Sequence, residues 1–137
     1  MKFLIGTYAF LIPPGTEVVA KAVIPPIDDF GTGETVWTFQ FGDFAFYIRL
    51  DPTDPPEELA RFIRSATKKA VDLRPVEING IKGMSYGDYH EGRSWIDWWL
   101  KKGELMICIN LQGWKAPTGA EREVHTEVLG SLHYVGR

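Results

Sequence analysis

The sequence predicts an α+β fold, in which an antiparallel sheet of about five or six strands packs against two helices. Three observations lead to this prediction. Apolar and polar residues alternate over several short stretches, which is typical of half-buried strands. Short turn sequences join these stretches, and short connections favour antiparallel pairing. Two other segments begin with capping residues and repeat their apolar residues with the spacing of a helix.

Length and composition indicate one domain, residues 1–137, with enough chain to bury a core. The formal net charge of −3 argues against nucleic acid as a partner, because phosphate binding needs a basic surface. No stretch is long and apolar enough to span a membrane. The single cysteine, Cys108, lies in the apolar run LMICIN. We therefore expect a buried thiol, and neither a disulfide nor a thiolate metal site.

The first residues predict a strand, because their apolar side chains alternate. These side chains belong to Phe3, Ile5, Tyr8, Phe10 and Ile12. Residues 20–22, AKA, resemble a signal-peptide cleavage site, but Pro13–Pro14 and Glu17 precede them and interrupt such a signal. We therefore expect a cytoplasmic protein. Residues 13–34 form a long connection rich in Pro, Gly and Asp, with a short strand from Val18 to Ile24.

Residues 35–50 predict a β-hairpin with Gly42–Asp43 as its two-residue turn. This turn sets three pairs opposite one another: Phe41 and Phe44, Phe39 and Phe46, Trp37 and Ile48. Because side chains alternate along a strand, one face of the hairpin is wholly apolar and must belong to the core. The other face is mixed and includes Tyr47 and Arg49.

Residues 51–72 predict the first helix, with Asp54 as its N-cap and Pro55 at its first position. Its apolar stripe should pack on the apolar face of the sheet. The closing helix, residues 118–135, begins with the capping-box pair Thr118 and Glu121. A narrow apolar stripe follows along this helix, made of Val124, Val128, Leu132 and Val135.

Residues 76–113 predict a strand meander with one turn at HEGR and a second, two-residue turn at Lys102–Gly103. The first turn sets Trp98 opposite Ser85, and the second sets it opposite Ile107. This face combines large apolar residues with small ones, which leaves room for a helix. Trp98 is therefore expected in the core.

The opposite face of the meander is aromatic but also holds polar and acidic groups. It carries Met84, Tyr86, Asp88, Trp95, Asp97, Trp99, Met106, Cys108 and Asn110. With Tyr47 and Arg49 of the hairpin it forms one mixed surface. Three interpretations stay open: the closing helix covers this face, the face is bare to solvent, or it is a groove for a partner or ligand. If it is a groove, Trp99 should be exposed where Trp98 is buried.

No catalytic, cofactor or metal motif is present, so we expect a protein-binding protein without enzymatic activity, cofactor or metal. His125 and His133 are eight residues apart, which is not the spacing of a helical metal pair. The residues expected to contact a protein partner are Trp95, Asp97, Trp99, Tyr86, Asp88, Tyr47, Arg49 and Met84.

The alternative function is binding or hydrolysis of a small molecule or carbohydrate by Trp95, Trp99 and the pair Asp88 and Asp97. In the predicted register these aspartates are diagonal neighbours on adjacent strands, roughly 7–8 Å apart. Two carboxylates about 6.5–9.5 Å apart, flanked by tryptophan, suit an inverting glycosidase. Otherwise one aspartate pairs with Arg49 and the other is solvated.

Four segments follow one another in a characteristic order: the hairpin VWTFQFGDFAFYIRL, the helix PPEELARFIRSATKKAV, the meander and the helix EREVHTEVLGSLHYV. This layout, over about the last hundred residues, resembles the PsbP-like/DcrB-like fold of small bacterial proteins, an α/β sandwich. The resemblance implies a mostly non-catalytic role, such as that of a secretion-effector chaperone, adaptor or immunity protein. It further implies a partner held on a sheet face, and a homodimer.

Overall fold

The computed structural model describes residues 2–13, 17–24, 34–51 and 73–136, which contain ten strands and one helix. The strands are β1 (Lys2–Ile5), β2 (Tyr8–Leu11), β3 (Glu17–Ile24), β4 (Glu34–Phe41), β5 (Phe44–Asp51), β6 (Leu73–Ile78), β7 (Ile81–Asp88), β8 (Ser94–Lys101), β9 (Met106–Gly113) and β10 (His133–Tyr134). The helix is α2 (Gly119–Ser131). Residues 52–72, where the first helix is predicted, lie outside the described residues.

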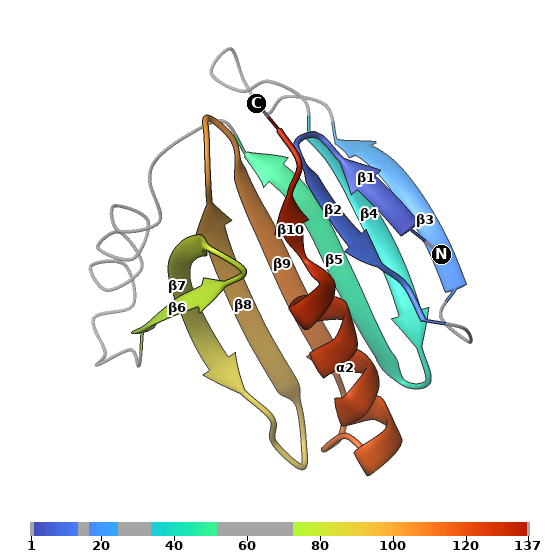
Figure 1. The fold of residues 1–137 in the computed structure, drawn as a ribbon. Helices are drawn as coiled ribbons and strands as arrows, with labels where there is room; N and C mark the ends of the chain where they lie inside the picture. The colour runs from blue at the N-terminus through green and yellow to red at the C-terminus, as the bar shows by residue number, and fades with distance from the viewer. Residues whose placement is uncertain (1, 14–16, 25–33, 52–72, 137) are drawn as a thin grey trace.

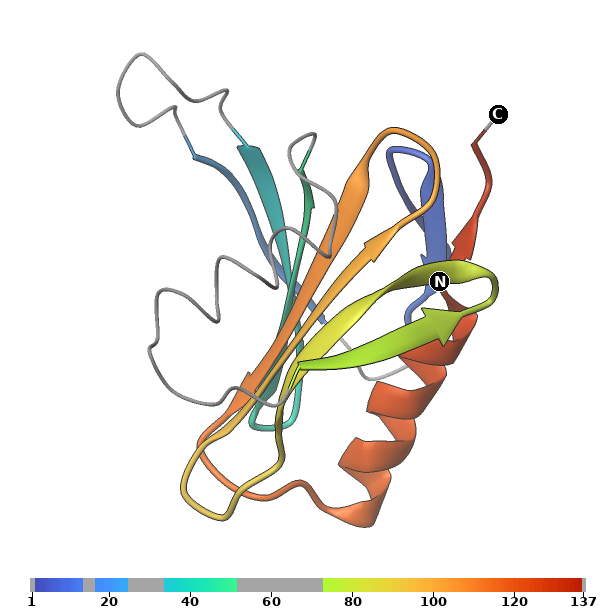
Figure 2. The same cartoon turned by 90° about the vertical axis from the view of Figure 1, so that its left-hand side faces the viewer.

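The strands form two antiparallel sheets, of seven strands in the order β3-β4-β5-β9-β8-β7-β6 and of three in the order β1-β2-β10. The α+β prediction is confirmed, with more strands than expected and with a second sheet that was not expected. Figures 1 and 2 show α2 and the small sheet on the same side of the large sheet. The core between these layers takes side chains from all three, among them Phe39, Phe46, Trp98, Leu100, Tyr8, Phe10, Val128 and Leu132.

The single strand predicted at the N-terminus is in fact the hairpin of β1 and β2. Gly6, with a φ of 59°, begins the two-residue turn between them, and Ile5 pairs with Tyr8. Because paired residues share a face, the apolar side chains before and after the turn point the same way, into the core. The same alternation therefore fits one bent strand or two paired ones. The strand predicted from Val18 to Ile24 is confirmed as part of β3.

The predicted hairpin around Gly42–Asp43 is confirmed in every pair that the sequence suggested, from Phe41 and Phe44 to Trp37 and Ile48. Its apolar face belongs to the same core as Trp98, as predicted. Phe39 and Phe46 are completely buried there. Full burial of a phenylalanine stabilises a fold by about 1.5–3 kcal/mol, so this hairpin contributes strongly to stability.

The meander keeps its predicted faces, but one of its turns is wider than predicted. The HEGR turn sets Ser85 opposite Trp98 as expected. The next turn was predicted at two residues, but it spans residues 102–105 and shifts the partner of Trp98 from Ile107 to Ile109. The buried Tyr8 holds this wider loop, because its hydroxyl accepts the Lys102 N–H at 2.9 Å and contacts the carbonyl of Leu105. A shift of two residues leaves every side chain on its predicted face.

Helix α2 begins as predicted, with a capping box between Thr118 and Glu121. It ends earlier than predicted, at Ser131, because the chain then enters β10 and pairs with β2. Val135 therefore lies beyond the helix and is exposed, and His133 belongs to β10. Within the described residues, no helix is long and apolar enough to cross a membrane.

The buried face of α2 contains two polar side chains, Glu121 and His125, beside Val128. Glu121 accepts hydrogen bonds at the N-terminus of its own helix and forms an ion pair with Lys115 at 3.1 Å. His125 is 1% exposed and packs its ring against Phe44 and Phe46. The predicted apolar stripe is therefore only partly correct, since two of its turns are filled by polar residues with specific partners.

The pKa of His125 is low for a physical reason. Burial lowers this pKa to about 4, against a raising effect of Glu121 and a further lowering effect of Arg122. The ring Nδ1 lies 3.2 Å from the Tyr89 hydroxyl, whereas Nε2 is buried and has no hydrogen-bond partner in the described part of the chain. The folded protein therefore keeps this histidine neutral at pH values where an unfolded chain would protonate it.

We expect acid to destabilise the protein through His125. Burial lowers the pKa of His125 from about 6.5 in the unfolded chain to about 4 in the folded protein. The stability that the neutral histidine contributes is therefore fully present above pH 6.5 and is lost as the pH falls towards 4. The loss attributable to this residue at pH 4 is about 3 kcal/mol. Urea unfolding of the wild type and of His125→Leu at several pH values between 7 and 4 measures it. The free energy of unfolding should fall more steeply with pH in the wild type. Parallel slopes for the two proteins would contradict this assignment.

Candidate functional site

The register of the large sheet places the predicted site residues on one face. Asp97 pairs with Tyr86 on one side and with Asn110 on the other, and Asn110 pairs in turn with Tyr47. The neighbouring rows align Asp88 with Trp95, and Met84 with Trp99, Cys108 and Arg49. Because α2 packs on the opposite face, with Trp98, the interpretation in which the closing helix covers this surface is wrong.

Trp99 is not the exposed ring expected of a binding groove. It is 8% exposed, almost the same as Trp98 at 9%, although the two rings point to opposite faces of the sheet. A second cluster of apolar side chains surrounds it, made of Leu73, Met106, Cys108, Met84 and Tyr86. The expected burial of Cys108 is confirmed. Each face of the sheet therefore has a core of its own around one of the two tryptophans.

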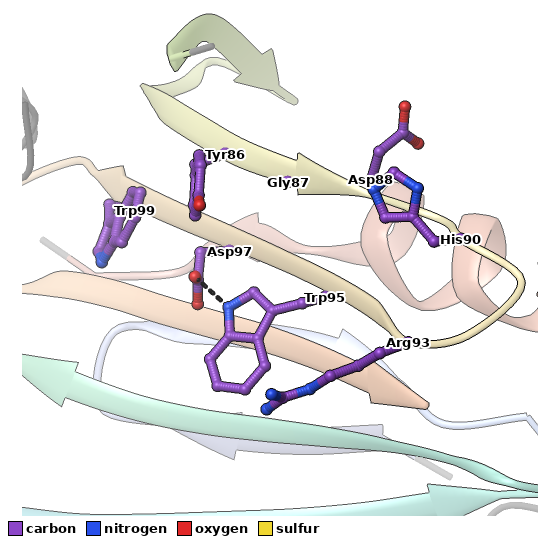
Figure 3. A pocket seen from close by; sticks show the side chains of 8 residues that line it. All are labelled: Tyr86, Gly87, Asp88, His90, Arg93, Trp95, Asp97 and Trp99. Atoms are coloured by element: carbon purple, nitrogen blue, oxygen red, sulfur yellow. Dashed lines mark hydrogen bonds between the residues drawn. The ribbon is translucent and has the colours of Figure 1, made fainter. Parts of the chain in front are cut away.

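An open groove of about 570 Å³ lies next to this second cluster. Its lining comes from β7, β8 and the turn between them, and consists of Tyr86, Gly87, Asp88, His90, Arg93, Trp95, Asp97 and Trp99 (Figure 3). The structure thus brings together Tyr86, Asp88, Trp95, Asp97 and Trp99 of the predicted set. It leaves out Met84, which packs in the second cluster, and Tyr47 and Arg49, which lie on β5.

Asp97 is the centre of a polar network at the base of the groove. Its Oδ2 accepts the indole N–H of Trp95 at 2.6 Å, and its Oδ1 accepts the side-chain amide of Asn110 at 2.7 Å. Asn110 in turn accepts the amide of Gln112 at 2.5 Å. Burial raises the pKa of Asp97, while the two hydrogen bonds and the charge of Arg49 act against this rise. Both carboxylate oxygens are thus occupied by donors from the chain itself.

Asp88 and Asp97 both line the groove, as the alternative function expects, but their carboxylates have different surroundings. Asp88 is exposed, and its Oδ1 accepts the backbone N–H of Tyr89 at 2.8 Å. Figure 3 shows its carboxylate turned away from Asp97. A glycosidase needs two carboxyl groups that flank one bond of the substrate, with one of them holding a proton towards it. Here Asp97 serves to fix the orientation of the Trp95 indole.

Sequence reasoning missed three residues next to the groove: His90, Arg93 and Trp114. The guanidinium carbon of Arg93 lies 4.5 Å from the ring centroid of Trp95 and 5.0 Å from that of Trp114. Trp114 is 76% exposed, the largest exposed fraction among the large hydrophobic side chains described. No signal in the sequence indicated this contact, because the predicted two-residue turn sets Ser94 opposite Leu111, whereas the structure pairs Ser94 with Gly113, the residue before Trp114.

No group of three or more His, Cys, Asp and Glu side chains in the described ranges is arranged to hold a metal ion. No protein-family model matches the sequence, and no curated protein matches it. The structure is similar to the crystal structure of a protein from Bacteroides thetaiotaomicron VPI-5482, with a TM-score of 0.62 and 12% sequence identity. The match covers 99% of this chain and 48% of that protein, so this chain spans about half of its length. At this identity the similarity is one of fold alone.

Proposed function

We propose that this chain is a non-catalytic protein-binding module, and that the groove over β7 and β8 receives a segment of its partner. The observation that carries the proposal is the open form of a groove lined by aromatic side chains. A site for a small molecule usually encloses most of its ligand, whereas an open groove suits an extended or helical segment of another protein. Tryptophan, tyrosine and arginine are the residues most enriched at the energetic centres of such interfaces.

The state of the polar groups supports binding rather than catalysis. Asp97 is held between Trp95 and Asn110, so its role is to position an aromatic wall. The buried part of Trp99 forms a firm base, and the exposed Asp88 forms part of the rim. A preformed groove of this kind loses little conformational entropy on binding.

The layout resemblance to the PsbP-like/DcrB-like fold agrees with this proposal. We extend the proposal to the roles that the resemblance implies, those of a cytoplasmic secretion-effector chaperone, adaptor or immunity protein. A homodimer also stays part of the proposal, and sedimentation of the purified protein tests it directly. A single species at the mass of one chain, 15.5 kDa, would exclude it.

Capture of a partner from an extract of the native organism tests the function. Wild-type protein should retain a specific protein at micromolar bait, and Trp95→Ala and Asp88→Lys should weaken that interaction. The expected loss for Trp95→Ala is about 2 kcal/mol or more, roughly a thirtyfold change in Kd. Asp88 is exposed on the rim, so its substitution changes the groove without disturbing the core.

The matched control is Leu4→Ala, which removes a side chain that is 64% exposed on the small sheet. This variant should bind like the wild type. Equal recovery with all four proteins would place the interface elsewhere on the molecule. Recovery of no specific protein would count against the binding function itself.

A further inference from the structure

Two tryptophan rings beside the groove share one cation, which belongs to the chain itself. The Arg93 guanidinium lies within 4.5 Å of the Trp95 ring centroid and 5.0 Å of the Trp114 ring centroid. Both distances fall inside the range of about 6 Å at which a cation and an aromatic face attract each other. Arg93 is exposed, and among the described residues no carboxylate lies within ion-pair distance of it. Its side chain is therefore held mainly by the two indoles.

Hydrogen bonds fix the Trp95 ring and the backbone beside Trp114. Trp95 is oriented by its bond to Asp97, as described above. Ser94, which is completely buried, accepts the backbone N–H of His90 at 3.1 Å and donates to the carbonyl of Lys115 at 2.8 Å. This one hydroxyl thus fixes the turn that carries Arg93 to the segment that carries Trp114. The fold therefore sets the Trp95 ring and the backbone that carries Arg93 and Trp114, and the slot lies between these two tryptophans.

The charges around the slot favour a cation over an anion. Asp88 and Asp97 line the same groove as Trp95, and the exposed Glu91 lies two residues before Arg93 in the turn. The one arginine or lysine among the described lining residues is Arg93 itself. If Arg93 leaves the slot, the remaining surface there is aromatic and acidic, which complements a basic side chain.

We infer that the slot between Trp95 and Trp114 binds an arginine side chain of the partner protein, and that Arg93 occupies it in the unbound state as an internal competitor. This inference rests on the proposed protein-binding function and names the chemistry that the site recognises. Arginine fits better than lysine, because a planar guanidinium stacks on an indole face and an ammonium does not. The seated Arg93 shows that the slot accepts this group.

Indole N–H signals in an ¹H–¹⁵N NMR titration test the inference, since the five tryptophans give few and resolvable signals. The probes are the peptide acetyl-Ala-Gly-Arg-Gly-Ala-amide and the same peptide with citrulline or lysine in place of arginine. The arginine peptide should shift the Trp95 and Trp114 signals. The citrulline peptide should leave them unchanged, and the lysine peptide should bind more weakly.

Two variants test whether Arg93 competes with the arginine peptide for the slot. Arg93→Ala should bind the arginine peptide about two- to fivefold more tightly, because it removes an internal cation–π competitor. Trp114→Ala should abolish the shifts, and because this ring is exposed the fold should remain intact, which unchanged signals of Trp98 and Trp99 would verify. Equal affinity of wild type and Arg93→Ala, or equal binding of the citrulline peptide, would overturn the inference.

The two proposals fail in different ways. A captured partner that depends on Trp95 and Asp88, together with no binding of the arginine peptide, would refute the arginine slot and leave the binding function intact. Binding of the arginine peptide without any captured protein would count against the protein-binding function and would leave the preference of the slot for arginine intact.

Discussion

Trp99→Ala should lower the free energy of unfolding by about 3–5 kcal/mol, as much as Trp98→Ala. The two residues are adjacent in β8 and point to opposite faces, yet their exposed fractions are 8% and 9%. Removing either indole leaves a cavity in a packed cluster, beside Met106 and Cys108 on one face and beside Leu100 and Ile109 on the other. Denaturant unfolding of both variants measures the two losses under the same conditions.

Trp114→Ala is the control for this pair, because its ring is 76% exposed. An exposed side chain has little burial to lose, so we expect a change within about 0.5 kcal/mol. A loss for Trp99→Ala as small as that for Trp114→Ala would show that the second cluster does not form a core. The base of the groove would then be loosely packed, and the proposed binding site would not be preformed.

Gly83→Ala should have an even larger effect and prevent the native pairing of β7 with β8. A Cβ atom on Gly83 would lie 1.8 Å from the carbonyl oxygen of Trp99 and 2.8 Å from the Cα of Leu100. Both are backbone atoms of the neighbouring strand, so neither can turn away as a flexible side chain would. We expect a loss of about 5 kcal/mol or more, comparable with the whole stability of many domains. Thermal unfolding followed by circular dichroism measures it.

Gly92→Ala serves as the matched control in the neighbouring turn. A Cβ atom on Gly92 would meet no heavy atom within 4 Å. The two substitutions restrict the unfolded chain equally, so the difference between them reports on the folded state alone. Similar melting temperatures for the two variants would mean that β7 and β8 are further apart than described.

Local signals predicted the parts of the fold that depend on neighbouring residues. The turn at Gly42–Asp43 and the capping box at Thr118 and Glu121 lie within a few residues of the strands or helix that they define. They were predicted correctly from sequence alone. The width of the loop at residues 102–105 was not predicted correctly, because Tyr8, the side chain that holds this loop, lies 94 residues away in the sequence. A two-residue turn was the simplest local solution, and only the distant hydroxyl favours the wider one.

In the candidate site, too, the features that depend on local sequence were predicted and those that depend on distant residues were not. Alternation along the strands was enough to place Asp97, Trp95 and Tyr86 on one face. The burial of Trp99 could not be predicted, because it depends on contacts with other strands, including Leu73 of β6. The slot between Trp95 and Trp114 depends on Ser94, whose hydrogen bonds join two turns that periodicity treats as independent.

The small sheet has a consequence for the order in which the chain assembles. β2 pairs with β10, and the side chain of Ser131 accepts the backbone N–H of Leu11 across 120 residues of sequence. Contacts between such distant segments close very long loops, which slows folding and places them late on the pathway. The β1–β2 hairpin and the hairpins of the large sheet are local and can form early, but β10 can pair with β2 only once residues 133–134 are present. We therefore expect the contacts between β2 and β10, which join residues near the two ends of the described chain, to form late in folding.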